Sequence, residues 1–79
     1  MSRITKRLEK QRVIHADDLL AEVELLDAYP HRYVFVMGYR EGWAGLFRAV
    51  EVLEGRGWEI VSWTIDYTNG CGAVARRLL

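Results

Sequence analysis

The sequence predicts an α+β fold, in which a helical N-terminal segment precedes a β-α-β-β core with a three-stranded, mainly antiparallel sheet. Apolar side chains recur at helical spacing in residues 17–28 and again in 43–54, and runs rich in β-branched and aromatic residues separate and follow them. Asn69-Gly70, a pair typical of two-residue hairpin turns, joins the last two runs. With 79 residues the chain has room for one domain, 1–79, composed of an N-terminal extension at 1–28 and a core at 32–77.

The N-terminal segment carries a moderate helical pattern in residues 2–14 and a stronger one in residues 17–28. The stronger pattern places four apolar residues on one helix face: Leu19, Leu20, Val23 and Leu26. Whether the two patterns form one helix or two stays open. A break near His15 and Ala16 is favoured, because the aspartates that follow are suited to a helix N-terminus. Pro30 ends the segment, since the residue before a proline avoids the helical conformation.

The core begins with a strand at 32–39, continues with a helix at 43–54 and ends with two strands, WEIVSWTIDY and CGAVARR. The helix face that we expect to be buried comprises Leu46, Phe47, Val50 and Leu53.

Glycines mark both ends of the core helix. The loop GYREGWAG, residues 38–45, matches neither common phosphate-binding spacing, so we interpret it as a strand-to-helix turn with Trp43 folded onto the sheet edge. At the other end, either Gly55 or Gly57 can adopt the left-handed conformation that stops a helix.

Both faces of the predicted sheet carry large apolar side chains. Strict alternation places Trp58 and Ile60 on one face of their strand, and Val61, Trp63 and Ile65 on the other. One helix covers only one face, so the N-terminal segment or a second copy must cover the other. Exposed apolar patches often mark interfaces, so we expect a homo-oligomer, most simply a two-fold dimer. The candidate interface residues are Leu19, Leu20, Val23 and Leu26, or Val61, Trp63 and Ile65.

Charge is distributed unevenly, although the formal net charge is zero. Residues 3–12 hold five basic side chains and one acid, whereas residues 17–27 hold five acids and no base. A net charge of zero argues against strong overall attraction to nucleic acid or to an anionic membrane. Nucleic-acid binding is therefore a secondary expectation, and its candidate residues are Arg3, Lys6, Arg7, Lys10 and Arg12.

The sequence contains no recognisable set of catalytic residues. Cys71, the single cysteine, has no partner for a disulfide and no general base near it in sequence. His15 and His31 lack the spacing of a metal site. Glu59 and Asp66 point to opposite strand faces by parity, so they cannot form a carboxylate pair. We therefore expect no enzymatic activity, no cofactor and no metal.

The segment Leu53-Glu54-Gly55-Arg56-Gly57-Trp58-Glu59-Ile60-Val61 resembles the motif L-x-x-x-G-W-E-L-V of a widespread group of small bacterial domains of unknown function. The resemblance covers residues 32–77 and implies a strand, a helix and a two-strand hairpin in a bacterial protein. It implies no catalytic residues, and residues 1–28 lie outside it. The arginine-rich and tryptophan-rich style of the sequence also resembles that of small phage-encoded proteins.

We expect a non-catalytic protein that acts through protein–protein interaction or regulation and associates with itself. One cysteine and no secretory signal favour the cytoplasm, and no apolar run is long enough to span a membrane. The alternatives are a nucleic-acid-associated protein that uses residues 3–12, a dimer that binds a small ligand, and a protein that binds a heterologous protein partner.

Overall fold

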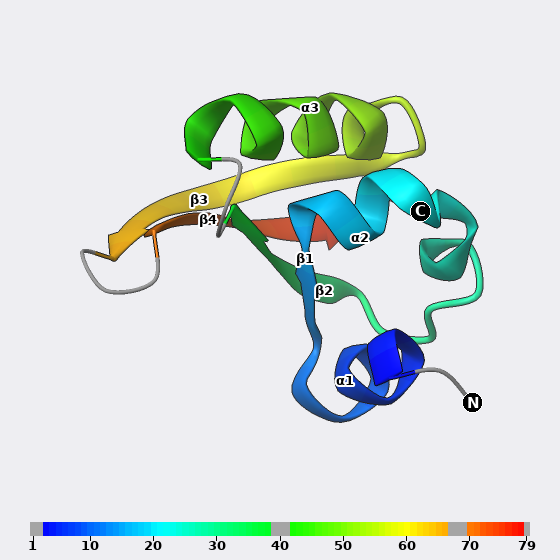
Figure 1. Cartoon of the computed structure of the whole chain (residues 1–79). Helices are drawn as coiled ribbons and strands as arrows, with labels where there is room; N and C mark the ends of the chain where they lie inside the picture. The colour runs from blue at the N-terminus through cyan, green and yellow to red at the C-terminus, as the bar shows by residue number, and fades with distance from the viewer. Residues whose placement is uncertain (1–2, 39–41, 67–69, 79) are drawn as a thin grey trace.

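The computed structural model describes residues 3–38, 42–66 and 70–78 of the chain. Figure 1 shows its elements, which in chain order are α1 (Arg3–Gln11), β1 (Val13–His15), α2 (Ala16–Ala21), the 3-10 helix η1 (Val23–Leu26), β2 (Tyr33–Gly38), α3 (Gly42–Glu54), β3 (Trp58–Asp66) and β4 (Gly70–Arg77). This combination of helices and one sheet confirms the predicted α+β class.

The described strands form a four-stranded mixed sheet in the order β1-β2-β4-β3. Strand β1 runs parallel to β2, with Val13 opposite Phe35, and the other neighbours are antiparallel. The prediction of three strands is wrong, because β1 lies within the segment that we assigned to a helix. Strand β1 has only three residues, which is too few to show an alternating pattern, and its apolar side chains continue the helical pattern of residues 2–14. Pairing with β2 decides the conformation, and the Phe35 N–H donates to the Arg12 carbonyl at 2.9 Å.

Arg12 separates α1 from β1. Its φ is 59°, and its N–H donates to the Leu8 carbonyl at 3.0 Å, which closes α1 with a left-handed residue. Helix α2 then begins at Ala16, so the N-terminal segment is divided into separate helices as favoured, but residues 12–15 separate them rather than a break at His15 and Ala16 alone. The helical pattern of residues 17–28 does not form one α-helix: α2 ends at Ala21, and the 3-10 helix η1 follows at Val23–Leu26. The acidic pair at positions 17 and 18 lies in the first turn of α2, where its negative charges interact favourably with the positive end of the helix dipole.

Helices α2 and α3 pack together on one side of the sheet, whereas α1 lies beside β1 at the opposite end of the molecule from α3 (Figure 1). The core between the helices and the sheet is apolar. Its largest fully buried side chains are Ile14, Leu19, Leu26, Leu46, Leu53, Val34 and Val36.

A β-bulge interrupts β3. Ile60 lies opposite Ala75 of β4 and Ser62 lies opposite Val74, so Val61 is an extra residue without a partner in β4. An extra residue reverses the alternation of side chains beyond it.

The bulge corrects the predicted faces of β3. Trp63 lies opposite Ala73, and Ile65 lies opposite Cys71; both of these β4 residues are buried on the α3 side of the sheet. Trp63 and Ile65 therefore share a face with Ile60, and the prediction that they lie on the other face is wrong. An alternating pattern alone cannot reveal a bulge, because the sequence continues without an evident break.

The sheet face away from α3 is only partly covered within the chain. Phe35 and Met37 of β2 are half-buried there, and Tyr33 is 46% exposed. The Phe35 ring lies over Gly72 of β4, where an added Cβ would meet Phe35 Cζ at 2.5 Å. The second face thus holds apolar side chains that the chain itself does not bury completely.

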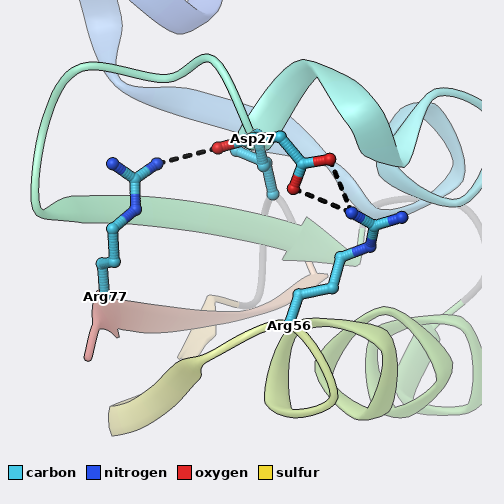
Figure 2. A network of polar contacts seen from close by, with 4 residues as sticks. Asp27, Arg56 and Arg77 are labelled. Carbon is cyan, nitrogen blue, oxygen red and sulfur yellow. Dashed lines mark hydrogen bonds and ion pairs between the residues drawn. The ribbon is translucent and has the colours of Figure 1, made fainter. Parts of the chain in front are cut away.

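Polar contacts tie the end of η1 to the ends of α3 and β4, as Figure 2 shows. Arg56 Nη1 donates to both carboxylate oxygens of Asp27, at 2.8 and 2.6 Å. Arg77 Nη2 donates to the Leu26 carbonyl at 2.8 Å, and the Arg77 guanidinium lies 4.8 Å from the centroid of the Trp58 ring.

Gly57 resolves the choice between the two glycines that follow α3. Its φ is +88°, and its carbonyl accepts a 2.7 Å hydrogen bond from the Leu78 N–H. Gly55 lies outside the left-handed region, and its N–H still donates to the Glu51 carbonyl as in a helix. Gly57 therefore reverses the chain, and Gly55 continues the last helical turn.

Candidate protein interface

Three aromatic rings meet where the first turns of α3 cross β3. Trp43 and Phe47 are four residues apart on α3 and so project from one side of the helix, while Trp63 projects from β3 toward them. The ring centroids are 5.5 Å apart for Trp43 and Phe47, 6.1 Å for Trp43 and Trp63, and 5.6 Å for Phe47 and Trp63. These separations are typical of favourable aromatic pairs, so the rings hold one another in place.

These rings remain in contact with solvent. Trp43 is 39% exposed, Phe47 48% and Trp63 46%, and Ile65, two residues along β3 on the same face, is 68% exposed. We call these four residues the aromatic surface. If each ring side chain offers on the order of 200–250 Å² when free, the three rings leave roughly 300 Å² of apolar surface in water. The largest apolar patch on a typical monomer measures about 300–600 Å² and often has a function, so the aromatic surface is a candidate interaction site.

The two α3 residues of the aromatic surface differ in how well the sequence predicted them. The predicted contact of Trp43 with the sheet edge is confirmed by its ring contact with Trp63. The prediction that Phe47 is buried is wrong. Phe47 lies beside the buried side of α3, over the edge strand β3. The buried residues of α3 are Gly45, Leu46, Ala49, Val50 and Leu53.

The candidate interface residues from the N-terminal segment lie elsewhere. Leu19 and Leu26 are 0% and 1% exposed in the core, and Leu20 and Val23 are half-buried and pack against it. These four side chains therefore join the N-terminal segment to the rest of the chain. Val61, at the bulge, is 43% exposed.

Strand β3 forms an edge of the sheet. Its only strand neighbour among the described residues is β4, so alternate N–H and C=O groups of β3 point outward without a ladder partner. The bulge at Val61 divides this edge, because residues 58–60 and residues 62–66 pair with β4 in registers that differ by one residue. Beyond the bulge, Ser62–Asp66 keeps a regular register with β4.

The basic candidate residues lie at the other end of the molecule, on α1 and just after it. Lys6, Lys10 and Arg12 are exposed. Arg3 and Arg7 belong to α1, but their side chains lie outside the described residues. Positions 3, 6, 7 and 10 follow helical spacing and therefore share one side of α1.

Cys71 is buried in β4, and its thiol donates to the Gly38 carbonyl across 3.6 Å. Burial raises the pKa of this thiol above its ordinary value, which disfavours the nucleophilic thiolate. Within the described residues, His, Cys, Asp and Glu side chains form no group of three or more that could hold a metal ion. The prediction that Glu59 and Asp66 lie on opposite faces of their strand is wrong, because the bulge reverses the alternation and the two positions pair with Arg76 and Gly70 on one face of β4. The side chain of Asp66 lies outside the described residues.

Comparisons with protein-family models, with curated proteins and with solved structures found no match for this chain. The resemblance of residues 53–61 to a bacterial domain motif therefore stays a prediction. None of the helices in the described part of the chain is long and apolar enough to cross a membrane.

Proposed function

We propose that this chain is a non-catalytic interaction protein, and that it binds another protein through the aromatic surface of Trp43, Phe47, Trp63 and Ile65. The observation that carries the proposal is the exposure of three rings that pack against one another. Tryptophan and other aromatic side chains are enriched in the buried centres of protein interfaces, because they bury a large area and lose little conformational freedom.

The structure around these rings also suits a docking surface. Because Trp43 and Phe47 stand on a regular helix and Trp63 on a strand, their positions are set by backbone elements before a partner arrives. A surface that is already ordered loses less entropy on binding than a flexible one. Burial raises the pKa of Cys71 and disfavours its nucleophilic thiolate form, so this residue does not favour a catalytic function over binding.

Site-specific photo-crosslinking in cells that produce the full chain tests this proposal. A benzophenone amino acid in place of Phe47 should yield a discrete protein adduct, and a Trp63→Ser substitution in the same chain should abolish it. Arg48 is the matched control, because it is exposed on the same helix but lies outside the aromatic surface. Equal adduct yields at positions 47 and 48, or no adduct at either, would contradict the proposal.

Nucleic-acid binding is the second candidate function, favoured by the exposed Lys6 and Lys10 on one side of α1. Fluorescence anisotropy with single- and double-stranded oligonucleotides tests it. This function requires binding that weakens steeply with salt and that the double variant Lys6→Glu/Lys10→Glu abolishes. Binding that is insensitive to both changes would contradict it.

A further inference from the structure

We infer that the partner of the aromatic surface is a second copy of this chain, joined by antiparallel pairing of the two β3 strands about a two-fold axis at Thr64. This inference rests on the proposed function, and it names the partner and the geometry of the same surface. The observations behind it are the free edge of β3, the position of its bulge and the residue pattern that follows the bulge.

The bulge limits which part of β3 can pair with another strand. Before the bulge, only residues 58–60 pair regularly with β4, and the extra residue Val61 then breaks the register of the edge. After it, Ser62–Asp66 pairs regularly with β4 and has an outer side that no described strand occupies. The midpoint of this regular stretch is Thr64. A pairing centred nearer the N-terminus would include the bulge, and one centred nearer the C-terminus would extend beyond the described part of β3.

When two copies of this stretch run antiparallel about Thr64, each residue lies opposite a residue of compatible chemistry in the other copy. Trp63 then lies opposite Ile65 of the second copy, and Ile65 opposite its Trp63, both pairs on the α3 side of the sheet. Thr64 faces its own counterpart on the other side, a pairing that is favourable between strands. Position 62 faces position 66, so no two charges of the same sign oppose each other. The alternation polar-apolar-polar-apolar-polar is thus self-complementary, as a two-fold interface requires.

The α3 side of such a pair brings the two aromatic surfaces together. Trp63 and Ile65 of each copy extend the apolar layer, and Trp43 and Phe47 stand directly above Trp63. The three rings leave roughly 300 Å² exposed, and Ile65 and the strand edge add to it. A standard stable interface buries about 800 Å² from each partner, so this surface supplies the apolar centre of an interface at or below standard size. We therefore expect reversible dimers at micromolar concentration.

Disulfide trapping at the axis tests the register directly. In a Cys71→Ala background, the variant Thr64→Cys places two cysteines opposite each other, with Cα atoms about 4.5–5.5 Å apart, a separation that a disulfide can bridge. Mild oxidation of the folded protein should then convert most of it to a covalent dimer. Ser62→Cys is the matched control, since it is exposed on the same strand face but lies roughly 13 Å from its counterpart in this register.

Sedimentation equilibrium provides the second measurement and does not depend on chemistry at cysteine. Trp63→Ser and Thr64→Lys should each weaken dimerisation by about tenfold or more, because one removes an interface ring and the other places two like charges at the axis. Leu78→Ser is the control, because Leu78 is an equally exposed apolar residue, at 50%, outside the aromatic surface. Circular dichroism of each variant establishes that it is folded before its assembly is compared.

Three outcomes overturn the inference. These are a wild-type protein that stays monomeric at several hundred micromolar, a dimer that Trp63→Ser and Thr64→Lys leave unchanged, and equal disulfide yields at positions 62 and 64. Failure here is distinguishable from failure of the proposed function. If the chain is monomeric but the benzophenone at position 47 still gives a heterologous adduct, the aromatic surface binds a protein and only the second copy is excluded.

Discussion

The turn after α3 gives a quantitative prediction, because it contains two glycines that the structure uses differently. Gly57 has φ of +88°, and among the described residues only the Leu78 carbonyl lies within reach of an added Cβ, at 3.9 Å. Alanine there meets no steric neighbour, so the cost is that of the left-handed backbone alone. That cost is about 1–2 kcal/mol for a residue with a Cβ, so Gly57→Ala should lower the free energy of unfolding by this amount.

Gly55→Ala is the matched control within the same turn. Gly55 lies outside the left-handed region, and its nearest neighbours would be ordinary contacts, the Val52 carbonyl at 3.5 Å and the Glu51 carbonyl at 3.6 Å. Alanine at position 55 reduces the conformational entropy of the unfolded chain without straining the folded one. Gly55→Ala should therefore raise the free energy of unfolding by about 0.4–1 kcal/mol. The two variants remove the same kind of residue two positions apart, yet they should change stability in opposite directions.

Urea denaturation followed by far-ultraviolet circular dichroism measures both effects. The slope of the unfolding free energy against urea should stay unchanged in both variants, while the midpoints move in opposite directions. Their melting temperatures should differ by roughly 6–24 °C, since 1 kcal/mol corresponds to about 4–8 °C in a domain of this size. Equal effects at the two positions, or a larger loss at Gly55, would refute the assignment of the reversal to Gly57.

Three further predictions follow from contacts elsewhere in the fold. Gly72→Ala should destabilise by about 1–3 kcal/mol, because its Cβ would lie 2.5 Å from Phe35 Cζ, and adding Phe35→Leu should recover much of the loss in the same urea assay. Arg56→Ala should change stability by at most about 1 kcal/mol, because the paired side chains are 38% and 55% exposed, and salt should shrink the difference. Stability should fall as pH rises above 9, because burial raises the pKa of Cys71 above 9.0 and that of Tyr29 above 10.0. The folded chain then holds these protons after the unfolded chain has lost them, so melting temperatures measured against pH should decline, less steeply in Cys71→Ala, and a rise would contradict this linkage.

The sequence predicted the elements with strong periodicity and missed those that depend on a distant partner. Helix α3 and the hairpin strands were recognisable from their apolar spacing and from Asn69-Gly70, although residues 67–69 lie outside the described residues. Strand β1 was not recognisable, since three residues show no distinctive period and only the parallel pairing with β2 makes them a strand. The left-handed Arg12 gave no signal either, because glycine or asparagine is the usual residue there.

The candidate interface was only partly predictable, because the faces of its residues depend on a bulge and on helix packing that the apolar pattern does not show. Trp63 and Ile65 were predicted to be interface residues, but from an alternation that the bulge at Val61 invalidates. Phe47 was assigned to the core because it lies next to Leu46 in the helical pattern. The helical spacing does contain a signal for this difference. Trp43 and Phe47 are four residues apart and form a stripe offset from the one that continues to Leu53, so they lie beside the buried face of the helix and not on it.

The strand order has a consequence for folding during synthesis. Strand β4 is the last of the described strands to be made, yet it lies between β2 and β3 and pairs with both. On the ribosome, β2 and β3 therefore emerge without the strand that joins them, and the sheet cannot close until Arg77 has left the exit tunnel. Until then the nascent chain exposes unpaired strand edges, which are the features that molecular chaperones shield from aggregation.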